Sequence, residues 1–167
     1  TFGPGPGSPP LTVLDTTDPA SILDVERSLD LPRTLFIVSS KSGTTIETIS
    51  LFRYFAERVR AARGDSGVLE NFVAITDRGT PLEKQANHEG FRRCFLNPPD
   101  VGGRYSALSY FGLVPAAAIG LDIDRLLQAA AVLDERAALE LGATLGGMAA
   151  EGRDKITFLP APALLQG

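Results

Sequence analysis

The sequence predicts an α/β protein with an open, mostly parallel sheet and helices on both of its faces. Three apolar runs rich in β-branched and aromatic residues, 34–39, 71–76 and 91–96, are typical of strands buried in a parallel sheet. Amphipathic segments alternate with them, so helices are expected over 45–63 and 81–89. Strand and helix in alternation imply right-handed crossovers and a three-layer sandwich.

The elements before this core are predicted from Gly, Pro and capping residues. Residues 1–10 are almost all Gly and Pro, which indicates an irregular lead-in. A short strand is predicted at 11–14. Asp18 followed by Pro19 supplies an N-cap and a first helical proline, so a helix is expected from Pro19 to about Leu29.

The second half of the chain is predicted to be mainly helical. Beyond a Gly-Gly pair it becomes rich in Ala and Leu as far as Ala150. The uncharged stretch 105–121 is shorter than the roughly 20 apolar residues of a membrane span, so it predicts a buried helix. A last strand is predicted at 156–159. Residues 11–167 are thus expected to form one domain.

Composition excludes several classes of protein. The 167 residues include 16 Lys and Arg against 20 Asp and Glu, a net charge of −4, and 44% are hydrophobic. That apolar content suffices for a core, and the lack of a basic block argues against a nucleic-acid partner. Cys94 is the only cysteine, which excludes an internal disulfide and a cysteine-rich zinc site and favours the cytoplasm. The chain begins at Thr1 and has Met148 as its only methionine, so we expect a processed chain or a fragment.

A loop between the first buried strand and the next helix predicts an anion site. It runs Ser39-Ser40-Lys41-Ser42-Gly43-Thr44-Thr45 and combines hydroxyls with a glycine that lets a ligand approach the backbone. Ligands of open parallel sheets bind beyond the carboxyl ends of the strands, and a helix N-terminus attracts anions. The loop lacks the spacings of a Walker A loop and of a dinucleotide fingerprint.

A purely structural interpretation of this loop stays open. Thr44 with Glu47 three residues later forms a capping box, T-T-I-E, in which Thr44 would cap the helix. Capping uses one hydroxyl and leaves the others free, so capping and anion binding are compatible. Lys41 alone is typical of a solvated loop charge.

A second candidate is an arginine on a glycine turn. Gly102-Gly103-Arg104 follows the third strand, and a fixed guanidinium suits an oxyanion that develops during a reaction. The alternative is that Arg104 caps carbonyl groups near a helix start.

Both motifs resemble the phosphoglucose isomerase family and its sugar isomerase (SIS) fold, a flavodoxin-like sandwich. The first motif, Ser40-Lys41-Ser42-Gly43-Thr44-Thr45-Ile46-Glu47-Thr48, is common to many SIS domains. The second, Gly102-Gly103-Arg104-Tyr105-Ser106 followed by Ala107-Leu108-Ser109, is more specific to glucose-6-phosphate isomerases. The flanking segments 13–19 and 95–99 look most like the bacterial branch in which transaldolase is fused to the isomerase. Similarity extends from Leu11 to the end.

The resemblance implies roles for individual residues. Ser40, Ser42 and Thr45 would bind the substrate phosphate, with the Lys41 backbone and Thr48 nearby, and Gly43, Gly102 and Gly103 would support the two loops. Arg104 would stabilise an enediolate, and Glu47 matches an acidic residue that the family places beside its catalytic histidine. Gly43 stands where many members have a bulky aromatic residue and Ile46 where many have glutamine.

The resemblance also implies that some machinery lies outside this chain. The family's general-base glutamate, ring-opening histidine and late lysine fall beyond the equivalent of Gly167, and a Gly-Ser phosphate loop precedes Thr1. His88 does not match the family's histidine, and we expect it at the surface. The chain is therefore expected to bind a sugar phosphate without turning it over.

The implied activity is the interconversion of glucose 6-phosphate and fructose 6-phosphate, with no metal and no cofactor. The resemblance allows a homodimer and a fused transaldolase domain, and it implies no membrane partner. The alternative is a non-catalytic SIS domain that senses a phosphosugar and regulates a partner. A phospho-acceptor domain is disfavoured because no paired aspartates end the first strand. Preference between glucose and mannose phosphates stays open.

Overall fold

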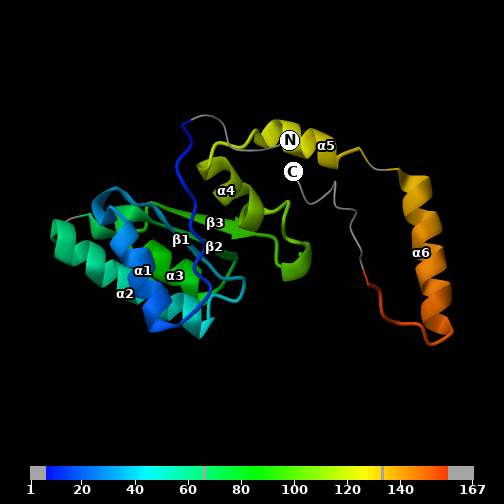
Figure 1. Cartoon of the computed structure of the whole chain (residues 1–167), viewed down its shortest axis with the longest axis horizontal. Helices are drawn as coiled ribbons and strands as arrows, with labels where there is room; N and C mark the ends of the chain where they lie inside the picture. The colour runs from blue at the N-terminus through cyan, green and yellow to red at the C-terminus, as the bar shows by residue number, and fades with distance from the viewer. Residues whose placement is uncertain (1–6, 66, 133, 158–167) are drawn as a thin grey trace. The chain divides into compact units, whose positions relative to one another are not determined.

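The computed structural model describes residues 7–65, 67–132 and 134–157, which belong to two compact units. One unit comprises Pro9–Ile119, and the other comprises Thr1–Ser8 with Gly120–Gly167. The first unit contains α1 (Pro19–Ser28), η1 (Leu31–Arg33), β1 (Phe36–Ser39), α2 (Ile46–Arg63), η2 (Val68–Asn71), β2 (Phe72–Asp77), α3 (Pro81–Glu89), β3 (Arg93–Asn97), η3 (Gly103–Tyr105) and α4 (Tyr110–Ala118). The second contains α5 (Ile123–Ala130) and α6 (Glu135–Ala150) (Figure 1).

The three strands form one parallel sheet in the order β1-β2-β3. Phe36 lies opposite Phe72, and Val73 lies opposite Arg93. All three predicted strands are confirmed, with shifted ends. β1 begins at Phe36 because Thr34 still belongs to the preceding turn, where its hydroxyl donates to the Asp30 carbonyl at 2.8 Å.

Helices pack against both faces of the sheet, as the sequence predicts. β2 is buried along its whole length, which requires cover on each side. Phe72 and Ala74 share one core cluster with α2 and α3. The alternate residues of β2 face the other way, toward α4, which contacts β2 and β3. Tyr110 of α4 packs its ring 5.4 Å from that of Phe95 on this second face.

The core beneath α2 is aromatic. Four residues of α2 are buried, namely Phe52, Phe55, Ala56 and Val59. Phe72 stacks on Phe36 with ring centroids 4.9 Å apart and meets Phe52 edge-on at 5.4 Å. Such ring pairs add to the stabilisation from buried area. Ile46, the first residue of α2, does not belong to this core, since it is 68% exposed.

A polar cluster fastens α1 to α2. The Glu26 carboxylate of α1 accepts a hydrogen bond from the Tyr54 hydroxyl and forms an ion pair with Arg58. The Tyr54 hydrogen bond is the main cause that lowers the pKa of Glu26 below its usual value of 4.5, and Arg58 adds to it. A lowered folded-state pKa means stability that is present above the unfolded-state pKa and lost as the pH falls through the folded one.

We therefore expect Glu26→Gln to lower the urea midpoint at pH 7 and to flatten its decline below about pH 4.5, which urea titrations across this range can measure. Asp24→Asn is the matched control, because Asp24 lies on the same helix in an ion pair whose side chains are 72% and 75% exposed. Exposed pairs contribute about 0–1 kcal/mol. Equal effects of the two substitutions would contradict a special role for Glu26.

Three predicted elements differ from the structure. The strand at 11–14 is wrong: Val13 is 75% exposed, and no described strand pairs with this segment. Ile156 and Thr157 are not in a strand, and the rest of that predicted strand lies outside the described residues. The helix predicted over 105–121 is shorter and half-buried, because Ser109 caps it at Tyr110 and Gly120 follows it with φ +77°.

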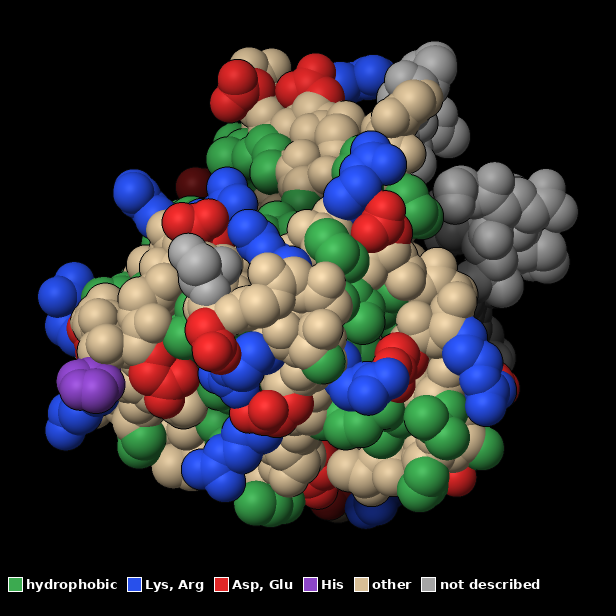
Figure 2. Space-filling view, turned by 90° about the vertical axis from the view of Figure 1, so that its left-hand side faces the viewer, with side chains coloured by type: hydrophobic (Ala, Val, Ile, Leu, Met, Phe, Trp, Pro, Cys, Tyr) green, Lys and Arg blue, Asp and Glu red, His purple; other side chains and the backbone are tan. Residues whose placement is uncertain are grey.

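The surface carries both signs of charge. Figure 2 shows basic and acidic side chains interspersed over the face in view. His88 is exposed, as expected. Nowhere in the described ranges is a helix both long and apolar enough to span a bilayer.

Candidate functional site

The loop after β1 folds around a buried serine. Ser40 continues the ladder, since its N–H donates to the Ile75 carbonyl at 3.0 Å. Its side chain accepts the Gly43 N–H at 3.1 Å and shares a hydrogen bond of 2.9 Å with the Thr45 hydroxyl. Ser40 is only 6% exposed, so it shapes the loop from below.

The helix that follows this loop begins without a side-chain cap. Thr45 is the N-cap of α2, but its hydroxyl bonds to Ser40 and accepts nothing from the first turn of the helix. The other described α-helices all have a capping side chain, supplied by Asp18, Thr80, Ser109, Asp122 and Asp134. The first N–H groups of a helix have no partner within it. Those of α2 therefore remain donors at the positive end of an 18-residue helix.

The predicted capping box is wrong. Thr44 lies one position before the N-cap, and its hydroxyl shares a 2.9 Å hydrogen bond with that of Ser42. Glu47 is exposed in the first turn. The Thr45 hydroxyl bonds to Ser40 and the Thr44 hydroxyl bonds to Ser42, so neither threonine side chain caps the helix.

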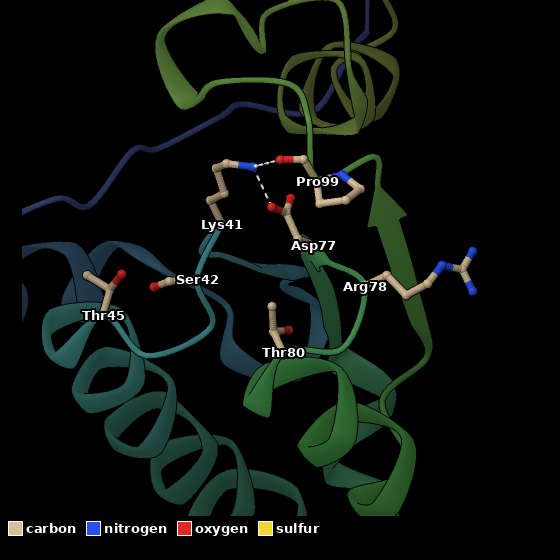
Figure 3. Close-up of a pocket in the computed structure, with 7 residues that line it drawn as sticks. All are labelled: Lys41, Ser42, Thr45, Asp77, Arg78, Thr80 and Pro99. Carbon is tan, nitrogen blue, oxygen red and sulfur yellow. Dashed lines mark hydrogen bonds and ion pairs between the residues drawn. The ribbon is translucent and has the colours of Figure 1, made fainter.

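An open pocket of about 500 Å³ lies beside this loop. Figure 3 draws the residues that line it. Its lining residues come from the ends of all three strands: Lys41, Ser42, Thr45, Asp77, Arg78, Thr80 and Pro99. Ser42 and Thr45 present hydroxyls, while Arg78 is exposed and directed away from the other labelled side chains. The combination of hydroxyls and free helix N–H groups suits a phosphate.

Gly43 has a packing role that the sequence did not predict. Its φ is +66°, and a Cβ atom there would lie 2.9 Å from both the Leu82 nitrogen and the Thr80 Cβ. The absent side chain thus makes room for the start of α3. This contact brings the loop 39–45 against the β2–α3 connection.

Lys41 turns away from the loop hydroxyls. Its ammonium group pairs with the Asp77 carboxylate at the end of β2 and donates to the Pro99 carbonyl at 3.2 Å. The Asp77 side chain is 11% exposed and that of Lys41 is 35% exposed. The alternative of a freely solvated Lys41 does not hold.

Arg104 lies in η3, in the loop that leads from β3 to α4. It is exposed and is not among the residues that line the pocket. Its side chain makes no hydrogen bond or ion pair within the described residues, so it does not cap a helix there. The neighbouring glycine lies near Lys41, since a Cβ atom on Gly103 would be 4.0 Å from the Lys41 Cδ.

The structure brings some predicted residues together and leaves others apart. Lys41, Ser42 and Thr45 surround the pocket, Ser40 lies beneath, and half-buried Thr48 lies farther along α2. Sequence reasoning missed four lining residues, Asp77, Arg78, Thr80 and Pro99. The rule that ligands bind beyond strand ends applies equally to β2 and β3, and could have found them. Over the described residues, no group of three His, Cys, Asp or Glu side chains is placed to hold a metal.

A parallel sheet with helices on both faces and a pocket at the carboxyl ends of its strands defines the class of open-sheet α/β proteins, whose ligands bind at that edge. The comparisons with known proteins narrow this class. A family model described as phosphoglucose isomerase matches residues 5–141. The chain belongs to the phosphoglucose isomerase family.

Individual relatives agree with this assignment. The glucose-6-phosphate isomerase of Thermus thermophilus is 38% identical over 132 residues, which are 79% of this chain and 32% of the relative. That of Campylobacter jejuni is 35% identical over 72% of this chain and 29% of the relative. This chain thus spans about a third of the length of these relatives.

Solved structures resemble this fold as well. A hypothetical protein of Thermus thermophilus matches with a TM-score of 0.65 and 40% identity, over 69% of this chain and 28% of that one. A glucose-6-phosphate isomerase of Chlamydia trachomatis matches with a TM-score of 0.56 and 32% identity, over 62% and 19%.

Proposed function

We propose that this chain forms the phosphate-anchoring part of a glucose-6-phosphate isomerase. The observation that carries the proposal is the uncapped N-terminus of α2, with Ser42 and Thr45 lining the pocket beside it. This site lies in a chain of the phosphoglucose isomerase family. The substrate is a sugar phosphate, and the reaction interconverts glucose 6-phosphate and fructose 6-phosphate.

The proposed mechanism divides the work between two loops. The Ser40–Thr45 loop and the first turn of α2, with Thr48, hold the phosphate in the ground state and in the transition state alike. A base removes the proton from C2 of the open-chain aldose and returns it to C1, and Arg104 stabilises the negative charge of the enediolate between these steps. The base and the ring-opening histidine are supplied from outside this chain, so the chain alone binds without turnover.

A second candidate is a domain that senses a phosphosugar without catalysis. One observation favours it: Asp77 is the only carboxylate among the residues that line the pocket, and it is paired with Lys41. A carboxylate held in an ion pair is a poor general base. The Gly102–Ser106 motif favours the isomerase.

Further features of the proposal concern the complete protein. The single cysteine suits the cytoplasm. The resemblance of the flanking segments supports an SIS domain fused to a transaldolase, and the family resemblance allows a homodimer. No metal or organic cofactor takes part in the proposed reaction.

The anion site can be tested with inorganic phosphate and fructose 6-phosphate, titrated into the ¹⁵N-labelled chain. We expect the largest shifts at the amides of residues 42–48. Ser42→Ala should raise the phosphate dissociation constant about tenfold, since a hydrogen bond to a charged group contributes about 1.5–3 kcal/mol.

Ser50→Ala is the control, because Ser50 is an exposed serine farther along α2. It should leave the dissociation constant unchanged. Shifts confined to other segments, or equal losses in the two variants, would overturn the proposed site.

A further inference from the structure

Lys41 joins the carboxyl ends of all three strands. It lies two positions beyond the end of β1, and its ammonium group contacts Asp77, the last residue of β2. The same group donates to the carbonyl of Pro99, two positions beyond the end of β3 (Figure 3). The backbone of Lys41 therefore belongs to the loop 39–45, while its side chain points toward β2 and β3 and contacts Asp77 and Pro99.

The positive charge of Lys41 is paired with the carboxylate of Asp77. Asp77 is 8% exposed, and its Oδ1 atom has no hydrogen-bond partner among the described residues. Lys41 is thus the one described group that satisfies this carboxylate. A carboxylate buried to this extent requires an opposite charge, so the pair is nearly neutral toward an incoming anion.

The loop that carries Arg104 rests on this lysine. The carbonyl of Pro99, five residues before Arg104, accepts a hydrogen bond from its ammonium group, and Gly103 lies near its aliphatic stem, since a Cβ atom there would be 4.0 Å from the Lys41 Cδ. Between these two points the chain forms local turns, with hydrogen bonds from the Val101 N–H to the Pro98 carbonyl at 3.5 Å and from the Tyr105 N–H to the Gly102 carbonyl at 2.9 Å. The Ser106 hydroxyl donates to the Gly103 carbonyl at 2.6 Å, so Arg104 follows Pro99 through a short hydrogen-bonded segment.

We propose that Lys41 is a positioning residue that, together with Asp77, fixes the 98–106 loop and hence Arg104, and that it is not a ligand of the phosphate. This inference rests on the proposed function in one respect: the proposed function explains why the position of Arg104 matters. The contacts themselves predict a mechanical effect on the loop, which can be measured without any reaction.

The test uses two substitutions of opposite charge effect, Lys41→Met and Asp77→Asn. Lys41→Met removes a positive charge, and Asp77→Asn removes a negative one. If Lys41 acts on the anion by charge, the two variants should change phosphate affinity in opposite directions. If the pair holds the loop, both should accelerate hydrogen exchange at the same amides.

We expect both variants to speed exchange at Val101, Tyr105 and Ser106 about tenfold, while Ala74 and Ile75 of β2 change less than about twofold. The phosphate dissociation constant should change less than about threefold in either variant. Lys41→Arg should restore most of the loop protection. Lys84→Met is the control for loss of an exposed lysine and should alter neither quantity.

Three outcomes would overturn the proposal. One is a rise of tenfold or more in the phosphate dissociation constant of Lys41→Met with unchanged loop exchange, which would make Lys41 a direct ligand. The second is unchanged loop exchange in both variants, and the third concerns Lys41→Arg. Failure of the unsubstituted chain to bind phosphate would count against the proposed function alone, since the exchange measurement decides the role of Lys41 independently.

Accelerated exchange in β2 would reveal general unfolding, and Lys41→Arg would then decide between the interpretations. If the loop of Lys41→Arg exchanges as fast as that of Lys41→Met while β2 stays intact, the proposal is also overturned.

Discussion

Gly43→Ala is expected to lower the free energy of unfolding by about 3 kcal/mol, which combines the cost of a left-handed backbone with that of overpacking. The backbone has φ +66°, and the new methyl group would lie 2.9 Å from the Leu82 nitrogen and the Thr80 Cβ. A backbone nitrogen cannot rotate away as a flexible side chain can. Urea unfolding followed by circular dichroism would measure the loss.

Gly90→Ala separates the two costs. Gly90 ends α3 with φ +80°, and a Cβ atom there would have no neighbour within 4 Å. This variant should lose only the backbone part, about 1 kcal/mol. Equal losses for the two variants would show that the contact between the anion loop and α3 has no energetic weight.

If the proposed isomerase contains this chain, Arg104→Ala is expected to lower its kcat about 100-fold, with much less effect on KM. Such a split marks an interaction made mainly with developing charge, and loss of one such donor costs about 3 kcal/mol. The Arg104 side chain is exposed and has no partner in the described part of the chain, so it is free to take this role. Steady-state kinetics in the direction from fructose 6-phosphate would measure both constants.

Two further variants sharpen this experiment. Arg104→Lys keeps the charge but loses the planar fork of donors, so it should recover only part of the loss. Arg53→Ala, at an exposed arginine of α2, should leave kcat unchanged. If Arg104→Ala raised only KM, the arginine would bind substrate rather than stabilise the enediolate.

Patterns within single elements predicted most of the first unit. The helix at 81–89 agrees to the residue, because a capping threonine, a first-turn proline and a terminal glycine mark both of its ends. The segment at 11–14 failed, although its composition is that of a strand, because a strand also needs a neighbour to pair with. That requirement is not a property of four residues.

The same distinction, between patterns within one segment and contacts between distant segments, applies to the candidate site. Ser42 and Thr45 could be found because they follow a strand and precede a helix, and both line the pocket. Thr44 as the N-cap was wrong, because the choice between two adjacent threonines depends on which of them Ser40 reaches. The Lys41–Asp77 pair spans 36 positions of the chain, and only the parallel arrangement of β1 and β2 brings its members together.

The arrangement of layers has a consequence for the order of folding. α2 and α3 cover one face of the sheet and α4 the other, so the chain changes face once in this unit, in the connection that carries Arg104. The segment from β1 to α3 buries the first face through the parallel pairing of β1 with β2, in which Phe36 lies opposite Phe72, and this pairing does not involve α4. The second face becomes buried only when α4 docks. We therefore expect the phosphate loop to form with the first half of the unit and the Arg104 loop to gain its shape last, so that binding competence precedes catalytic geometry along the folding route.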